Sequence, residues 1–280
     1  MRNLYQEAKN CFLTADPDEK LEHGLEVVGA WGGALLEWQD GDSLQLEPLL
    51  HLDAPGRLDK PVLVEPNRLK NRGFKSMQQR AALIHALAHI ELTAVNLCWD
   101  SIYRYRDLPK EYYDDWIKTA GEETQHFYLL RNSLRDMGYD YGDFPAHDEL
   151  WQMALATADD LMARMAIVHR VLEARALDVV PFSEQKFRAI GDRQTADSLI
   201  IIANDEIGHV NAGARWFRYC CEQEQLDPYK MFFQLLKKYL KSTPRGPFNQ
   251  EARLQAGFSR AEMQELERLD AEYKHKKTRN

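Results

Sequence analysis

The sequence predicts an all-α protein, and three observations favour that class. Apolar residues recur at helical spacing almost everywhere beyond residue 76. Alternating runs rich in valine and isoleucine are scarce. The best candidate for a strand, residues 61–64, is short and begins at a proline. The chain has 280 residues, of which 44% are hydrophobic and 29% charged, so it can bury a core without disulfides.

Residues 1–75 are expected to form N-terminal helices and a wrapping arm. Asp16 and Pro17 are typical of an N-cap followed by proline at the first helical position. Segment 40–75 is interrupted by prolines and glycines, which leaves either an arm packed on a core or a mobile loop. We favour the arm, because the segment carries apolar side chains that favour burial: Leu49, Leu50, Leu52, Val62, Leu63 and Val64.

Four long helices are expected within 76–225, at 76–105, 109–137, 157–180 and 192–224. Ser76 and Gln79 have capping-box spacing, and the third helix is expected to stop before Pro181. The connection 139–156, with a short helix at 147–154, is long enough to cross a bundle from end to end. A tail at 226–280 carries two further expected helices, at 228–241 and 260–274.

Charge and composition exclude several functions. The net charge of −8 at pH 7 argues against a nucleic-acid partner, since only the tail is basic. The sequence has no run of about 18 uninterrupted apolar residues, so we expect no membrane span. The first residues lack the apolar core of a signal peptide, and we expect a cytoplasmic protein. The cysteines show no paired metal-binding spacing and are expected to be buried: Cys11, Cys98, Cys220 and Cys221.

Two Glu-x-x-His motifs stand out. Glu123 precedes His126 and Glu206 precedes His209, so each pair lies on one face of its helix, one turn apart. Such a pair arises easily by chance, and the pair of Glu272 and His275 in the charged tail is interpreted as a chance match. The other two share their faces with apolar residues and are therefore expected to point into the core.

Two more glutamates, Glu91 and Glu173, also share their faces with apolar residues. A buried carboxylate must be paired, protonated or bound to metal, and Arg170 is the one cation near the face of Glu173. A cluster of divalent metal ions is the simplest solution. The spacing forms a repeat, because Glu91 and Glu123 are 32 residues apart and Glu173 and Glu206 are 33 apart.

Residues 75–225 resemble the ferritin-like di-iron carboxylate superfamily, in which two helices each supply a glutamate and two others each supply Glu-x-x-His. The stretches HALAHIELTAV, GEETQHF, HRVLEARALD and NDEIGHV resemble more narrowly an uncharacterised bacterial family of ferritin-like proteins. The resemblance implies a four-helix bundle with a dinuclear metal site. It implies these ligands: Glu91, Glu123, His126, Glu173, Glu206 and His209. Glu123 and Glu206 are expected to bridge the metals, with Glu91 and Glu173 terminal.

Three further residues are candidates to support the ligands. Glu122 and Asp205 each precede a motif, and in similar di-iron proteins the acid of one half orients the histidine of the other. We therefore expect Asp205 to bind His126 and Glu122 to bind His209, against the alternative of solvent-facing acids. His169 lies one turn before Glu173 and is a seventh ligand, a proton relay or a hydrogen-bonded lining residue.

Carboxylate-rich ligation with two imidazoles suits iron or manganese better than zinc or copper. The resemblance implies two iron ions, or manganese or a mixed pair, able to reduce O₂ by two electrons. The first hypothesis is an O₂-dependent oxidoreductase of hydroxylase or oxygenase type, with a small-molecule substrate and an unidentified electron donor. The alternatives are a ferroxidase or iron-handling protein and a non-catalytic metal-binding bundle. An enzyme would form a monomer or a homodimer, and a storage protein a large cage.

Overall fold

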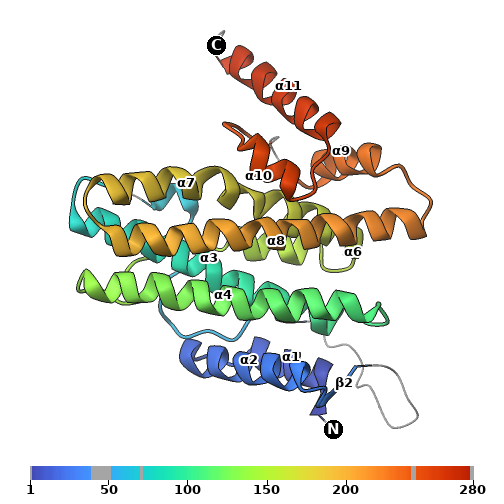
Figure 1. The fold of residues 1–280 in the computed structure, drawn as a ribbon, viewed down its shortest axis with the longest axis horizontal. Coiled ribbons are helices and arrows are strands. Elements are labelled where there is room, and N and C mark those ends of the chain that lie inside the picture. Colours follow the sequence, from blue (N-terminus) through green and yellow to red (C-terminus); the bar gives the residue numbers. More distant parts are fainter. Residues whose placement is uncertain (1, 39–51, 70–71, 241–243, 278–280) are drawn as a thin grey trace. The chain divides into compact units, whose positions relative to one another are not determined.

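The computed structural model describes residues 2–38, 52–69, 72–240 and 244–277. Within these ranges the chain is helical apart from loops and two strands of two residues each, which confirms the all-α prediction (Figure 1). The chain divides into two compact units, Met1–Gln152 and Met153–Asn280. Helix α5 (Glu149–Ala156) lies across the boundary in the sequence. The predicted division at residues 75 and 225 stays a prediction.

The first unit is built on α3 (Met77–Arg104) and α4 (Lys110–Asp136), which pack side by side (Figure 1). Helices α1 (Leu4–Leu13) and α2 (Pro17–Gly32) pack on this pair, α1 against α3 and α2 against α4. Strand β1 (Arg2–Asn3) pairs in parallel with β2 (Leu36–Glu37), and a short 3₁₀ helix, η1, spans Pro66–Arg68. The core of this unit therefore lies between the first four helices.

The second unit is built on α7 (Ala174–Ala189) and α8 (Arg193–Gln223), which also pack side by side. A short helix α6 (Leu161–Ala163) leads into a π-helix, η2 (Arg164–Leu172), and η2 leads into α7. Three helices follow α8: α9 (Pro228–Tyr239), α10 (Gln250–Gln255) and α11 (Arg260–Lys277). The sequence did not predict α10.

Several local predictions are confirmed. The side chain of Asp16 caps α2 by accepting from two backbone N–H groups, and Pro17 begins that helix. The Ser76 hydroxyl accepts from the Gln79 N–H at the start of α3 (3.2 Å). All four cysteines are buried. Of the arm's apolar residues, Leu52, Leu63 and Val64 are half-buried, whereas Val62 is 58% exposed and contradicts the prediction; Leu49 and Leu50 lie outside the described residues.

The third predicted helix does not stop before Pro181; α7 continues through it to Ala189. A proline inside a helix leaves the carbonyl four residues earlier without its usual N–H donor. Here that carbonyl belongs to Leu177, and the side-chain amide of Asn249 donates to it at 3.2 Å. A side chain 72 residues away in sequence thus supplies the missing donor, and local sequence patterns carry no sign of it.

The π-helix ends at Leu172, and Glu173 is its C-cap residue. The Glu173 N–H donates to the Val168 carbonyl, five residues back, at 3.3 Å. Helix α8 approaches this segment closely at Gly213, where a Cβ atom would lie 2.7 Å from the His169 carbonyl oxygen. Single π-helical turns inside α-helices are frequent at functional sites. The π-helix therefore marks the neighbourhood of Glu173 as a region of interest.

Among the described helices, α3 is long and apolar enough to cross a membrane by length and composition. Of the apolar window, however, 72% is buried inside the fold. The core helix of a globular protein meets the same criteria, so this helix gives only weak support for a membrane span.

Candidate metal centre

In the first unit, three predicted ligands converge. Glu91 comes from α3, and Glu123 and His126 come from α4, which packs along α3. The His126 Nδ1 atom lies 3.3 Å from a carboxylate oxygen of Glu91 and 3.3 Å from one of Glu123. The three side chains are buried, with exposures of 5%, 1% and 0% in sequence order. Two carboxylates and one imidazole thus share a site shielded from water.

Burial and charge shift the pKa values in this cluster strongly. Burial, with a further contribution from the nearby Glu123 carboxylate, raises the pKa of Glu91 to about 8. Burial alone would lower the pKa of His126, but hydrogen bonds and charge from Glu123 and Glu91 outweigh it and raise that pKa to about 11. Both shifts mean that the cluster retains protons, so its carboxylates favour positive charge beside them. A divalent metal ion would serve the same purpose.

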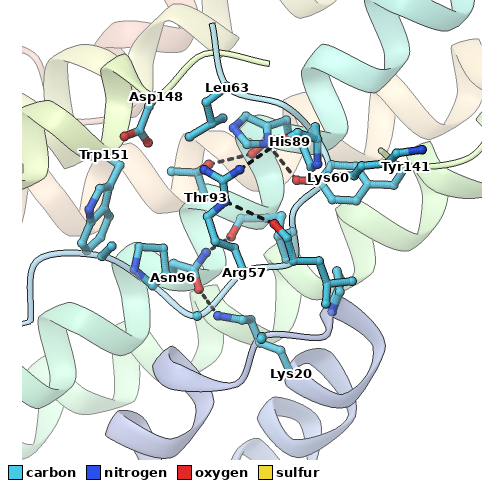
Figure 2. Close-up of a pocket in the computed structure, with 18 residues that line it drawn as sticks. Lys20, Arg57, Lys60, Leu63, His89, Thr93, Asn96, Tyr141, Asp148 and Trp151 are labelled. Carbon is cyan, nitrogen blue, oxygen red and sulfur yellow. Dashed lines mark hydrogen bonds between the residues drawn. The ribbon is translucent and has the colours of Figure 1, made fainter. Parts of the chain in front are cut away.

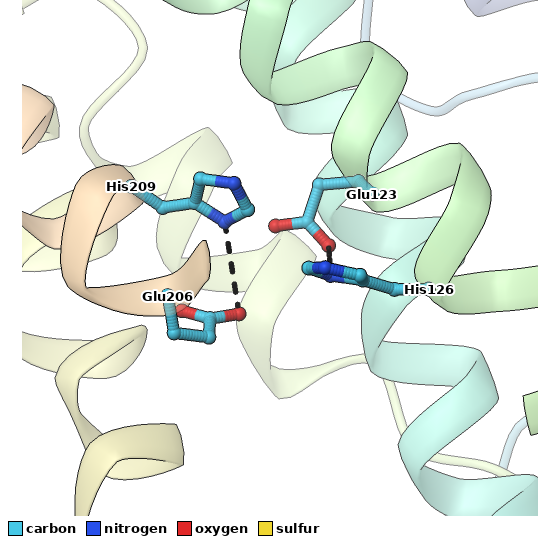
Figure 3. Close-up of side chains that lie close together, drawn as sticks. All are labelled: Glu123, His126, Glu206 and His209. Atoms are coloured by element: carbon cyan, nitrogen blue, oxygen red, sulfur yellow. Dashed lines mark hydrogen bonds and ion pairs between the residues drawn. The ribbon is translucent and has the colours of Figure 1, made fainter. Parts of the chain in front are cut away.

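The second unit carries the matching motif on α8, where Glu206 and His209 are both buried. The His209 Nδ1 atom lies 3.8 Å from a carboxylate oxygen of Glu206. Figure 3 draws this pair and the pair of Glu123 and His126, with a dashed line inside each. Each unit therefore presents one buried Glu-x-x-His motif on a long helix.

Glu173 lies between the π-helix and α7, and its side chain is 9% exposed. It shares a hydrogen bond of 2.9 Å with His169 Nδ1, and His169 is fully buried. Of the three roles predicted for His169, this geometry favours the hydrogen-bonded residue that positions Glu173. Histidine and carboxylate partners of this kind orient metal ligands in many proteins.

Arg170 does not neutralise Glu173. Its guanidinium donates to the Glu262 carboxylate at 2.8 Å and lies over the rings of Phe232 and Phe258, 4.4 Å from each centroid. The cation that the sequence placed near Glu173 thus belongs to another ion pair. In the first unit, two buried carboxylates and one buried imidazole form a donor set that fits a hard or borderline divalent ion such as Fe²⁺ or Mn²⁺.

The two acids next to the motifs differ in environment. Lys118 donates to both carboxylate oxygens of Glu122 at 2.6 and 2.7 Å, close to solvent. Asp205 is half-buried. The expected bonds of Glu122 to His209 and of Asp205 to His126 each join one unit to the other and stay predictions. In the tail, Glu272 is exposed and pairs with Arg268, consistent with its interpretation as a chance match.

Sequence reasoning missed Lys20, a fully buried lysine on α2 that lines a cavity of the first unit. One signal was available, because Lys20 shares a helix face with Gly24 and Val27, and both of these are buried. A lysine on an apolar stripe is more often solvent-exposed through its long stem, so the sequence alone gave no reason to single it out.

Comparison with known proteins identifies the family of this chain. Residues 13–264 match the family described as "Protein of unknown function (DUF455)". The chain belongs to the DUF455 family. A protein of Haemophilus influenzae (strain ATCC 51907 / DSM 11121 / KW20 / Rd), described as "Uncharacterized protein", is 42% identical over 212 residues, covering 73% of this chain and 74% of its own length. No solved structure matches the chain. The DUF455 match includes all six predicted ligands.

Proposed function

We propose that this DUF455 protein binds two iron ions, or manganese or a mixed pair, and acts as an O₂-dependent oxidoreductase. The observation that carries the proposal is the buried convergence of Glu91, Glu123 and His126 in the first unit. Two adjacent acids with one imidazole are an expensive arrangement for an apolar interior unless a cation is bound. The same motif on α8 would supply Glu206 and His209 as ligands of a second, equivalent half of the metal centre.

The proposed ligands follow the repeat in the sequence. Each metal would take one histidine, His126 or His209, and one terminal carboxylate, Glu91 or Glu173. Glu123 and Glu206 would bridge, as the general pattern of ferritin-like di-iron proteins implies. A ferritin-like bundle of α3, α4, the η2–α7 segment and α8 is part of this proposal.

The chain's own residues would have three tasks. The glutamates hold a net negative charge in a site shielded from water, which favours divalent cations over monovalent ones. His169 fixes the orientation of Glu173 through their 2.9 Å hydrogen bond. The surrounding apolar side chains exclude bulk water and so limit competing reactions. A ferrous pair, when bound, would supply the electrons for reducing O₂.

The proposed partners are O₂, a small-molecule substrate and an electron donor, in a cytoplasmic monomer or homodimer. The net charge of −8 still argues against a nucleic-acid substrate. Hydroxylation or oxygenation is the proposed reaction class. The chain carries long segments, 1–75 and 226–280, outside the four ligand-bearing helices, and a storage subunit does not need such segments.

The test is O₂ uptake by protein loaded anaerobically with ferrous iron. An oxidoreductase centre consumes O₂ in an amount set by the bound iron and then stops until a reductant is added. Continued oxidation of excess ferrous iron, with growth of a ferric core, would replace the proposal with the iron-handling alternative. Absence of any uptake would leave a metal-binding structural bundle. Glu123→Ala is expected to lose this uptake, and Glu272→Ala, in the exposed tail, is its matched control.

A further inference from the structure

A cavity of about 90 Å³ lies wholly within the first unit (Figure 2). Its walls are the start of α2, segment 54–63, one face of α3, and three residues that follow α4 in the sequence, Tyr141, Asp148 and Trp151. The wall on α3 consists of His89, Leu92, Thr93 and Asn96. None of the predicted metal ligands lines it. The cavity therefore calls for its own explanation.

The cavity is positively charged in a negatively charged protein. Lys20, Arg57 and Lys60 line it, against one acidic side chain, Asp148. Among the residues that the structure describes, none of these three cations forms an ion pair with a carboxylate. The chain as a whole carries a net charge of −8. A local excess of cations of this kind attracts anions.

Among the residues that line the cavity, Lys20 gives the strongest indication that an anion binds there. The residue is 1% exposed, and its ammonium group donates to two neutral acceptors, the Phe12 carbonyl at 2.9 Å and the Asn96 side-chain oxygen at 2.5 Å. An ammonium group has three donors, so two neutral acceptors leave its charge uncompensated. Burial lowers the pKa of Lys20 to about 7, because the buried ammonium group loses the water that would stabilise its charge. An anion in the cavity would supply the missing compensation.

Arg57 is available for the same purpose. Its guanidinium donates only to backbone carbonyls, to Pro61 at 2.9 Å and to Leu58 at 3.4 Å, so no fixed carboxylate occupies its fork. Arginine binds carboxylates and phosphates with two parallel hydrogen bonds. Lys60 follows three residues later and is exposed. The two side chains stand on a segment that could admit a ligand from solvent.

The remaining walls suit a small organic group. Leu63, Leu92 and the ring of Trp151 are apolar, and the Trp151 N–H is already used by the Asp53 carbonyl (2.9 Å). Tyr141 shares a hydrogen bond of 2.7 Å with His89 and offers its ring. A ligand with one oxyanion group and a short carbon skeleton would therefore meet both the charge and the apolar surface.

The cavity is separate from the proposed metal half-site. Thr93 and His89 each lie two residues from Glu91, which is about 200° around the helix. Helix α3 therefore stands between the two. Ligand binding in this cavity is independent of metal binding by Glu91, Glu123 and His126, so either can be absent without the other.

We propose that this cavity binds a small anionic metabolite through its carboxylate or phosphate group, held by Lys20, Arg57 and Lys60. The oxyanion lies against these three cations and accepts from them. Thr93 lines the same wall and offers a neutral hydroxyl, although that hydroxyl now donates to the His89 carbonyl (2.7 Å). Asp148 is the one side chain that opposes binding.

Calorimetric titration at fixed low ionic strength tests the proposal, with three probes: inorganic phosphate, phenyl phosphate and benzoate. Binding of the organic probes but not of phosphate identifies an organic oxyanion ligand; binding of phosphate as well identifies a site for the free ion or for any phosphate ester. Arg57→Gln and Lys60→Gln together are expected to weaken binding by about tenfold or more, because charged hydrogen bonds are lost. Asp148→Asn is expected to strengthen it.

Arg68→Gln is the matched control, because Arg68 is an exposed arginine of the same arm and does not line the cavity. The Arg68→Gln variant and the Arg57→Gln/Lys60→Gln double variant should both keep the wild-type circular dichroism spectrum and the wild-type metal content. Lys20→Met provides a second, buried variant, expected to lose binding. No measurable binding of any probe, or equal weakening by Arg68→Gln and the double variant, overturns the proposal.

Discussion

Glu206 and Glu272 both begin a Glu-x-x-His motif, but their surroundings differ. Glu206 is 4% exposed on α8, whereas Glu272 is exposed on α11 and pairs with Arg268. Burial makes Glu206 a candidate ligand, whereas Glu272 belongs to an ordinary surface ion pair. The same motif thus acquires two meanings from its environment.

Glu206→Ala is expected to remove at least one metal ion per chain, because the account assigns Glu206 to both metals. Glu272→Ala is expected to leave the metal content unchanged. Elemental analysis of both variants, purified beside the wild type, checks this directly. Retention of two metals by the Glu206→Ala protein would contradict the bridging assignment.

Lys20 gives a pH prediction. Its pKa is lowered to about 7 in the folded protein, chiefly by burial, and returns to about 10.5 on unfolding. Between these values the unfolded chain binds more protons, so this group makes the free energy of unfolding rise with pH, by up to about 1.4 kcal/mol per pH unit. Urea unfolding from pH 7.5 to 9.5, without phosphate or carboxylate buffers, should show a shallower rise for Lys20→Met. Equal slopes would show that Lys20 keeps its proton in the fold.

The packing of α8 against the π-helix depends on a glycine. Gly213→Ala would place a Cβ atom 2.7 Å from the His169 carbonyl oxygen, closer than real contacts allow. Because backbone atoms must move, we expect a loss of about 1–3 kcal/mol in the free energy of unfolding. Gly208→Ala on the same helix meets nothing within 4 Å and should stabilise the protein by about 0.5–1 kcal/mol.

Denaturant unfolding of the two glycine variants measures this difference. Equal effects of the two substitutions would show that α8 is free to shift away from the π-helix. A perturbed Gly213→Ala protein should also bind metal less tightly, because His169 positions Glu173 through their hydrogen bond.

Elements with local causes could be predicted from the sequence. Residues close together in the sequence determine the Asp16 and Ser76 caps and the long apolar stripes of α3 and α8. The structure confirms these features. The continuation of α7 through Pro181 could not be predicted, because its compensating donor, Asn249, comes from a distant segment. The sequence did not predict the π-helix either, and its close approach to α8 at Gly213 is a contact between segments about 40 residues apart in the chain.

Part of the candidate site could likewise be predicted from the sequence, and part could not. Helical spacing and apolar faces identified Glu91, Glu123 and His126, and their convergence follows from the packing of α3 on α4. The partner of Arg170 could not be found by spacing, because Glu262 lies 92 residues further along the chain. The cavity around Lys20 was missed for the same reason, since it combines α2, segment 54–63 and α3.

Across the whole molecule, the proposed metal centre takes ligands from both compact units, Met1–Gln152 and Met153–Asn280. A metal bound by the folded chain alone stabilises it, by about 2.7 kcal/mol when free metal is at 100 times its Kd. Removing metal with a chelator should therefore lower the Tm, and restoring Fe²⁺ or Mn²⁺ anaerobically should reverse the change. Scanning calorimetry should show a smaller shift for Glu206→Ala, because this variant is expected to lose at least one metal ion. An unchanged wild-type Tm would contradict metal binding by the native fold.

The most direct measurement is the metal content per chain of protein expressed with iron and manganese and never exposed to chelator. The account predicts about two iron or manganese ions, one for each Glu-x-x-His motif. Zero metal, in protein that also fails to take up ferrous iron anaerobically, would contradict it. The buried acids around His126 would then be stabilised by protons and hydrogen bonds alone.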